Sequence, residues 1–232
     1  MNSQKHEPLV WSDHDAAVWH ACDIAAGVIR GSLAHRPRIA APFPAGLDPT
    51  EQMLANGPFN MLTYRPGGDG TYRHNGGFFL ATGAAGLALS AGLAVTRAIG
   101  NTSRRAEATA AATPRWRPEA DGDLWVSSHG FYLQTVHGLF PWAWRAVGSA
   151  SMVGPAEVHL QGNGQDGATS WIIKSPWSEL LFVLWALAVH PAHPQLLTAG
   201  WLPPGWLDRC DANGFRPRNQ LHTLSGNRGG VQ

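Results

Sequence analysis

The sequence is poor in charge and has almost no cysteine. Charged residues make up only 14% of the 232 residues, whereas hydrophobic residues make up 44%. This composition excludes a disordered or collagen-like chain and fits one domain, or one small domain with a helical attachment. Two cysteines, Cys22 and Cys210, are too few for a disulfide framework or a four-cysteine zinc site. The 17 basic and 16 acidic residues nearly cancel, whereas a nucleic-acid-binding domain would carry a basic excess.

An apolar leader is also missing. Residues 1–11 contain no hydrophobic stretch of the kind found in secretory signals. We therefore expect a cytoplasmic protein, and association with a membrane is the alternative. That alternative rests on the segment from Gly76 to Thr96, which contains no charged residue and is long enough to cross a bilayer.

The composition of this segment weakens its insertion into a membrane. Between residues 78 and 96, only seven of nineteen residues are large and apolar, and the glycine, serine and threonine residues oppose insertion. We expect an Ala/Gly-rich helix over about 78–112 that packs on the amino-terminal helix. In the alternative interpretation, residues 76–105 anchor the protein in a membrane.

The start of the chain carries helix signals. Ser12 and Asp15 form a capping-box pattern, and apolar residues then recur at helical spacing, which predicts a helix over 13–33. Asp48, followed by proline, predicts a short helix that ends at Gly57.

Turn-forming residues suggest how the chain is divided. The glycine-rich turn PGGDG predicts a hairpin over 60–74. Two prolines indicate a linker over 114–122, between a helical region over 1–113 and a second domain over 123–214. The polar residues 215–232 are expected to form a flexible tail.

From residue 123 the pattern changes to short strands separated by turn residues. The candidate strands are DLWVS (123–127), FYLQT (131–135), LFPWAWR (139–145), VGSASMV (147–153), EVHLQ (157–161) and ATSWIIK (168–174). This spacing is typical of an antiparallel sandwich or barrel. Residues 177–189 are almost entirely apolar and too short to span a membrane, so they predict a helix that covers the sheet and buries Trp185. The expected fold class is α+β, with amino-terminal helices and an antiparallel half-barrel closed by a helix.

This order of strands and one terminal helix resembles a pleckstrin-homology-like (PH-like) or GRAM-like domain. The matching stretches are GDLWVSSHGFYLQT, GLFPWAW and SWIIKSPWSELLFVLWALAVH, within residues 97–190. Uncharacterised actinobacterial proteins of this type are similar in their Ala/Gly-rich helix, which ends in a segment like Asn101–Arg105, and in a PRW motif, here Pro114–Trp116. The resemblance implies a bacterial, non-catalytic binding or scaffold module, directed to a protein or a membrane surface and without a cofactor.

The first hairpin of this resemblance offers no cation. Phosphoinositide-binding members place several Lys or Arg there, whereas this hairpin offers Ser127, Ser128 and His129, so we do not expect inositol phosphate to bind. A binding surface would use this polar turn, aromatic side chains, and the strand face that carries Glu157 and His159. The candidate binding residues are Ser128, His129, Trp142, Trp144, His159, Trp201 and Trp206.

His190 and His193 are the best candidate metal ligands, because their spacing could bring two imidazoles together. Pro191 and Pro194 break a helix there, and no third ligand is near in the sequence. A metal-dependent enzyme that uses this histidine pair is therefore the second alternative function. We expect the purified protein to hold far less than one zinc ion per chain.

Nucleophilic catalysis would require a base beside the nucleophile. Cys210 with Asp208 and His222 is one conceivable set, although the position of Cys210 on a tryptophan-flanked helix indicates packing. His20 and Cys22 do not share a face of their helix. No G-x-S-x-G motif, phosphate loop or dinucleotide fingerprint occurs, so we assign no catalytic residue.

Overall fold

The structure is a computed structural model, and it describes residues 10–65, 112–164 and 167–226. The chain forms two compact units, one made of residues 1–62 with 118–232 and the other of residues 63–117. The helices and most of the sheet belong to the first unit.

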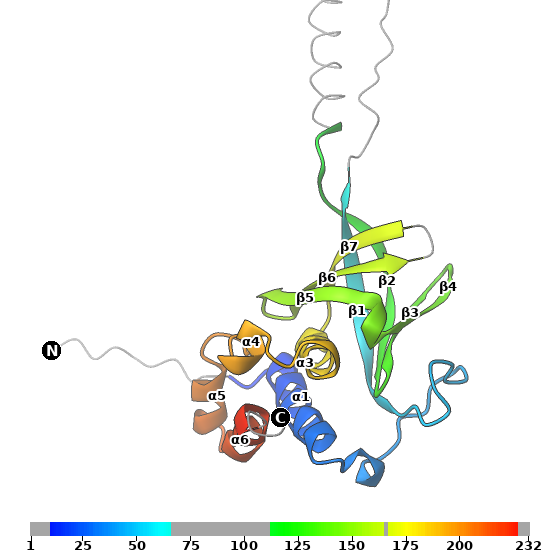
Figure 1. Cartoon of the computed structure of the whole chain (residues 1–232). Coiled ribbons are helices and arrows are strands. Elements are labelled where there is room, and N and C mark those ends of the chain that lie inside the picture. The colour runs from blue at the N-terminus through cyan, green and yellow to red at the C-terminus, as the bar shows by residue number, and fades with distance from the viewer. Residues whose placement is uncertain (1–9, 66–111, 165–166, 227–232) are drawn as a thin grey trace, which may run out of the picture. The chain divides into compact units, whose positions relative to one another are not determined.

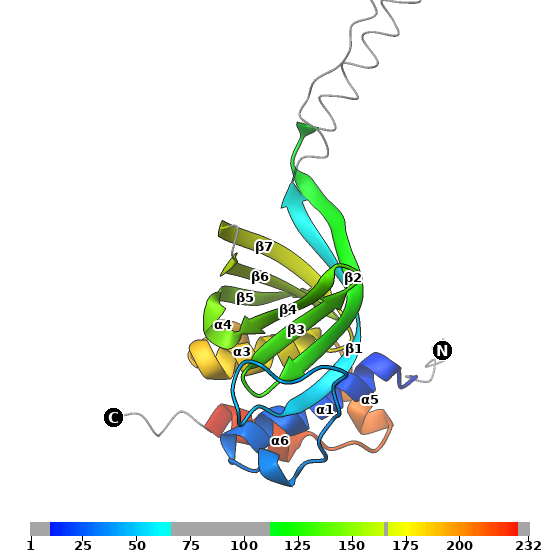
Figure 2. The same ribbon diagram turned by 90° about the vertical axis from the view of Figure 1, so that its right-hand side faces the viewer.

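Seven strands form one antiparallel sheet that curls into a half-barrel (Figure 1, Figure 2). The strands are β1 (Met53–Arg65), β2 (Arg115–Ser127), β3 (Gly130–Thr135), β4 (Gly138–Ala143), β5 (Val147–Gly154), β6 (Glu157–Gly164) and β7 (Gly167–Lys174). Their order in the sheet is β4-β3-β2-β1-β7-β6-β5. The chain therefore makes two meanders, and β7 returns to pair with β1.

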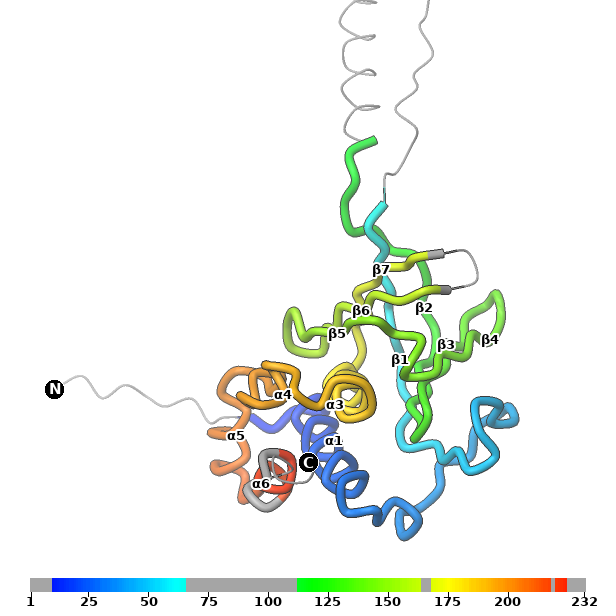
Figure 3. The backbone as a smooth tube through the Cα atoms, in the orientation of Figure 1, coloured from blue at the N-terminus to red at the C-terminus, as the bar shows by residue number. Residues whose placement is uncertain are grey.

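Helices cover one end of the half-barrel. They are α1 (Asp13–Ile29), α3 (Ser178–Val189), α4 (Pro194–Leu197), α5 (Trp206–Ala212) and α6 (Arg218–Gly226), with 3₁₀ turns η1 (Leu33–His35) and η2 (Trp144–Ala146). α3 packs against β5 and β6, and α1 packs on α3 and α6 (Figure 3). Among the described residues, no helix is both long enough and apolar enough to cross a membrane.

The prediction of an α+β half-barrel closed by a helix is confirmed. All six strands expected after residue 123 are present, and the pairings recorded between them are antiparallel. The expected closing helix is α3, which is buried on nearly every side because the sheet lies on one face and α1 on another. Trp185 is 2% exposed, and its Nε1 donates a hydrogen bond to the carbonyl oxygen of Val147 at 2.9 Å.

The amino-terminal helix also forms as expected, with a complete capping box between Ser12 and Asp15. It ends at Ile29, a little before the predicted end, and Gly31 follows with a φ of +65°. A glycine in this left-handed conformation commonly terminates a helix.

The short helix predicted to end at Gly57 is wrong, because β1 begins at Met53. Asp48 caps a turn instead: its Oδ1 accepts a hydrogen bond from the Thr50 amide at 2.7 Å. The residues that follow gain sheet hydrogen bonds and bury Leu54 and Phe59 in the core, which a helix at this place would not do.

Two further expectations about the chain's division are corrected. Residues 114–122 do not form a linker, since β2 begins at Arg115 and tolerates Pro118 within its exposed first half. The tail predicted over 215–232 contains α6, whose Leu224 is buried against the core cluster that includes α1.

Two other expectations fall mostly outside the described residues. Of the hairpin predicted over 60–74, residues up to 65 continue β1 and the rest lie outside. Nearly all of the helix predicted over 78–112 lies outside as well.

The outer face of β1 to β3 is covered by the loop between α1 and β1. Phe43 of this loop lies with its ring 5.5 Å from that of Trp125 and 5.0 Å from that of Tyr132. Glu51 fixes the loop, because its carboxylate accepts hydrogen bonds from the Tyr132 hydroxyl at 2.6 Å and from the Leu47 amide at 3.1 Å. This second apolar cluster leaves both faces of the sheet covered there.

Candidate functional site

The turn between β2 and β3 brings the candidate residues Ser128 and His129 together with Asp48. Ser128 Oγ lies 2.9 Å from His129 Nδ1, and His129 Nε2 lies 3.8 Å from Asp48 Oδ1. Ser128, His129 and Asp48 thus follow one another as a nucleophile, its base and an orienting carboxylate would. However, Ser128 Oγ also accepts a hydrogen bond from the Gln52 amide at 3.0 Å. The amides that follow, at His129 and Gly130, both donate to Ser127 Oγ. These amides are therefore not available to stabilise an oxyanion, and the turn holds the chain in place.

Trp142 and Trp144 occupy different environments. Trp144 is buried, and its Nε1 donates to the carbonyl oxygen of Ser128 at 3.3 Å, so it is a core residue. Trp142 on β4 is half-buried and meets Trp171 on β7 edge to face, with ring centroids 4.6 Å apart. Three strands separate β4 from β7 in the sheet, so this contact exists only because the sheet curls.

The three other candidate binding residues serve structural roles. Trp201 and Trp206 are buried in the core and present no surface to a ligand, which corrects that expectation. Trp206 Nε1 donates to the carbonyl oxygen of Asp15 at 3.2 Å. His159 is half-buried and hydrogen-bonds Ser170 at 2.8 Å, while Glu157 pairs with Lys174 rather than with His159.

The hairpin of β3 and β4 exposes an apolar surface. Val136, Leu139 and Phe140 are 93%, 36% and 46% exposed, and no other described segment has three large exposed hydrophobic side chains so close in sequence. We call Val136, Leu139 and Phe140 the β3–β4 ridge. Leu139 and Phe140 are consecutive on β4 and lie on opposite faces of the hairpin, with Val136 at its tip. Exposed apolar side chains gathered in one segment mark interaction surfaces more often than scattered ones do.

Both edge strands of the sheet are protected against pairing with another strand. β4 carries Pro141, which has no N–H to donate. On β5, the side-chain amide of Gln195 hydrogen-bonds both the N–H and the carbonyl oxygen of Met152. At Pro141 and Met152 the two edges therefore offer no free N–H to an added strand.

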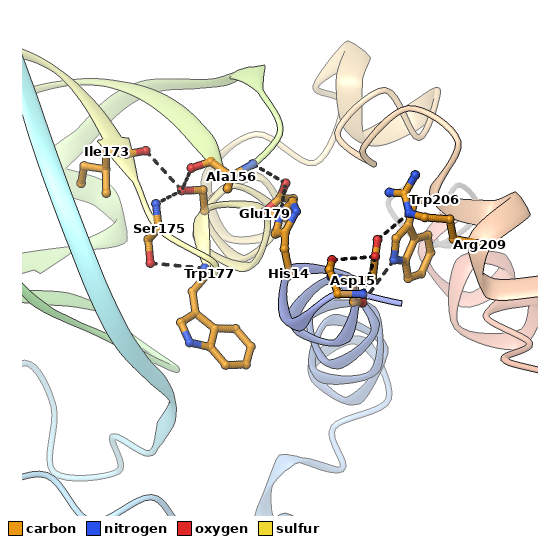
Figure 4. A network of polar contacts seen from close by, with 11 residues as sticks. His14, Asp15, Ala156, Ile173, Ser175, Trp177, Glu179, Trp206 and Arg209 are labelled. Carbon is orange, nitrogen blue, oxygen red and sulfur yellow. Dashed lines mark hydrogen bonds and ion pairs between the residues drawn. The ribbon is translucent and has the colours of Figure 1, made fainter. Parts of the chain in front are cut away.

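A buried ionic contact joins α1 to α3. Figure 4 shows His14 and Glu179 pointing toward each other, with His14 Nε2 3.0 Å from Glu179 Oε1. The same oxygen accepts the Ala156 amide at 2.9 Å, which ties the β5–β6 turn to α3. The hydrogen bond to Glu179 raises the pKa of His14, and burial opposes this only in part. A protonated His14 balances the charge of Glu179, which is 1% exposed.

A second ionic contact fixes the carboxy-terminal helices to α1. Arg209 Nε lies 2.8 Å from Asp15 Oδ1, and both groups appear beside Trp206 in Figure 4. Burial raises the pKa of Asp15, but hydrogen bonds from Ser12 and Arg209 outweigh it and hold that pKa below its usual value. Asp15 thus caps its own helix and anchors α5 at once.

A groove of about 330 Å³ opens beside His14, between α1, β1 and the β5–β6 turn. Its walls include three prolines, Pro58, Pro155 and Pro176, together with Asn60, Glu157 and Lys174. Its charged groups already pair with one another: Lys174 Nζ lies 2.7 Å from Glu157, and His14 contacts Glu179. The groove is therefore electrostatically satisfied by the chain itself.

One member of the candidate metal pair, His193, is engaged in capping. His190 and His193 lie with ring centroids 5.5 Å apart, but His193 Nδ1 accepts the amide of Gln195 at the start of α4. A neutral His193 that accepts at Nδ1 carries its proton on Nε2, so neither nitrogen of His193 is free for a metal. In the part of the chain that the structure describes, no cluster of three metal-ligating side chains occurs.

The remaining nucleophile candidates are also accounted for. Cys210 is fully buried, and burial raises the pKa of its thiol to about 11. Asp208 is exposed on the same helix, and His222 is exposed on α6. His20 and Cys22, which neighbour each other on α1, are also separated: His20 is exposed whereas Cys22 is buried, so they do not act together.

The sequence reasoning missed the His14–Glu179 contact and the β3–β4 ridge. For the contact, the available signal was Glu179 itself, since a lone carboxylate within the apolar run 178–189 indicates a buried partner. For the ridge, the signal was Val136 in a two-residue turn where polar residues are usual.

Comparison with models of known protein families, with curated proteins and with solved structures finds no match for this chain. Fold and surface therefore define its class: an α+β protein with a curled, antiparallel, seven-stranded half-barrel, helices at one end, and an exposed apolar hairpin at the sheet's edge.

Proposed function

We propose that this chain is a non-catalytic, PH-like binding or scaffold module that contacts a protein or a membrane surface. The resemblance to PH-like domains implies antiparallel strands followed by one closing helix, and the order of β1 to β7 with α3 supports it. The fold thus supplies a rigid platform, and the surface on that platform carries the function.

The observation that carries the proposal is the β3–β4 ridge. Val136, Leu139 and Phe140 expose apolar area to water, and Val136 is almost fully exposed. Burial of such area against a partner is favourable by about 25 cal/mol per Å². The candidate residues of the polar turn, Ser128 and His129, instead bond within the chain. Anchoring through residues 76–105 stays a prediction, because that segment lies outside the described residues.

Site-specific photo-crosslinking in the organism that makes the protein tests the proposal. A photoreactive amino acid at position 136 should crosslink to protein or to lipid. The matched control places the same group at Val153, which is 52% exposed on the opposite edge strand, β5. Equal crosslinking at the two positions, or none at 136, would contradict a binding role for the ridge.

A further inference from the structure

The β3–β4 ridge is preorganised. The turn consists of only two residues, Val136 and His137, between the paired residues Thr135 and Gly138. Thr135 Oγ1 accepts the His137 amide at 3.0 Å, and Gly138 has a φ of +139° that a side chain would disfavour. Because the tip is already ordered, a partner that binds it loses little conformational entropy.

The surface next to the ridge is acidic. Asp123 on β2 is opposite Gln134 on β3, which in turn is opposite Leu139 on β4. Residues directly opposite each other share a face of an antiparallel sheet, so Asp123 lies in the same row as Leu139, two strand spacings or about 10 Å away. Asp121 lies two residues earlier on the same strand, β2.

These two carboxylates are available to a partner. Asp121 and Asp123 are both exposed, and neither takes part in a salt bridge within residues 10–65, 112–164 and 167–226. The next row of this face, Trp125 and Tyr132, is already covered by the loop that carries Phe43. On this face the open surface therefore combines Leu139, close to Val136 at the tip, with negative charge, whereas Phe140 lies on the other face of the hairpin.

The chemistry of this surface selects its partner. An anionic membrane would be repelled by Asp121 and Asp123, and an added strand would find no N–H at Pro141. We infer that the β3–β4 ridge binds a protein segment that presents apolar side chains flanked by lysine or arginine. This inference rests on the proposed function and names its partner class.

The test uses the full chain and a fluorescent amphipathic peptide built from leucine and lysine. A peptide with glutamate in place of lysine is the charge control. The leucine–lysine peptide should bind, and the glutamate peptide should not. The double variant Val136→Ser/Leu139→Ser should weaken binding about 10-fold or more, because apolar contact area is lost. Asp121→Asn/Asp123→Asn should weaken it about 2- to 10-fold at low salt and have little effect at high salt.

Two controls keep the outcome clear. Val153→Ser should bind as the parent does, since Val153 is exposed on the other edge strand. Val136 is almost fully exposed, so its substitution should leave the thermal unfolding midpoint unchanged.

Other occupants give distinct results. Binding to phosphatidylcholine vesicles, with or without phosphatidylglycerol, that is lost in Val136→Ser/Leu139→Ser would overturn the inference and leave the proposed function standing. Self-association that depends on the same residues would overturn it in favour of a second copy. If neither peptide nor vesicles bind through the ridge, and crosslinking at position 136 also fails, both the inference and the proposed function fall.

Discussion

Gln195 makes both hydrogen bonds that a neighbouring strand would make to Met152. Its Oε1 accepts the Met152 amide and its Nε2 donates to the Met152 carbonyl oxygen, each at 2.9 Å. A side chain from α4 thus closes the open edge of β5, 43 residues away in sequence. This protects the edge from pairing with another chain.

Gln195→Leu should open this edge. The Met152 amide should exchange its hydrogen at least 10-fold faster, and the free energy of unfolding should fall by about 1–3 kcal/mol, because two polar groups lose their partner. Hydrogen exchange followed by NMR measures the first effect and urea unfolding the second. Gln161→Leu is the control, since Gln161 bonds only Ser149 Oγ, on the exposed face of β6. Unchanged protection at Met152 would show that Gln195 does not close the edge.

The contact between His14 and Glu179 should make stability depend on pH. The pKa of His14 in the folded chain is raised above 6.5, so the folded state holds this proton more tightly than the unfolded state. The stabilisation is complete below about pH 6.5 and is lost as the pH rises through the higher folded-state pKa. Free energies of unfolding in urea should therefore fall above about pH 6.5 in the parent and change less in His14→Gln.

Two other histidines act in a different pH range. Burial lowers the pKa of His159 and also of His193. The stability that these two neutral histidines allow is therefore present above about pH 6.5 and is lost as the pH falls below it. Comparison of the parent with His14→Gln above this pH isolates His14. His137→Gln, in the exposed turn, is the control. Equal slopes in parent and His14→Gln would refute the assignment.

Trp185 should be a main stabilising residue of the core. Trp185→Ala should lower the free energy of unfolding by about 3–5 kcal/mol, because it leaves a large cavity between α3 and the sheet. Trp185→Phe should cost less, about 1–3 kcal/mol, since it keeps most of the volume but leaves the Val147 carbonyl oxygen unpaired. Urea unfolding measures both values. A loss below about 1 kcal/mol for the alanine variant would contradict a core role.

Gly57 should tolerate no side chain. A Cβ there would lie 2.9 Å from Trp177 Nε1 and would displace the indole, whose Nε1 donates to the Asn56 carbonyl oxygen at 2.7 Å. Gly57→Ala should therefore cost about 1–3 kcal/mol and shift the indole N–H resonance of Trp177. Gly46→Ala is the matched control, because nothing lies within 4 Å of its added Cβ. Equal stability of the two variants would show that the indole adapts without cost.

The two thiols should be inert while the chain is folded. Cys22 and Cys210 are fully buried, and burial raises the pKa of Cys210 to about 11 and that of Cys22 further. At pH 8, about a thousandth of Cys210 is then thiolate, the reactive form. A thiol reagent should find no reactive cysteine in the native protein and two in urea. Rapid labelling of the native chain would mean that α1 and α5 separate readily.

The elements of this protein that depend on local chemistry followed from the sequence alone. Ser12 and Asp15 cap α1 because the two side chains lie within one helical turn of each other. The strands β2 to β7 follow turn residues and alternating apolar positions, and α3 follows an uninterrupted apolar run. Each of these signals is contained in a window of a few residues.

Only the tertiary structure decided the rest, because the partners lie far apart along the chain. Met53 starts a strand rather than ending a helix since β1 completes its hydrogen bonds with β7, more than a hundred residues later. His14 and Glu179 are 165 residues apart, so no local pattern pairs them. The exposure of Val136 and Phe140 depends on which strand becomes the edge of the sheet, and the fold of the whole sheet makes that choice.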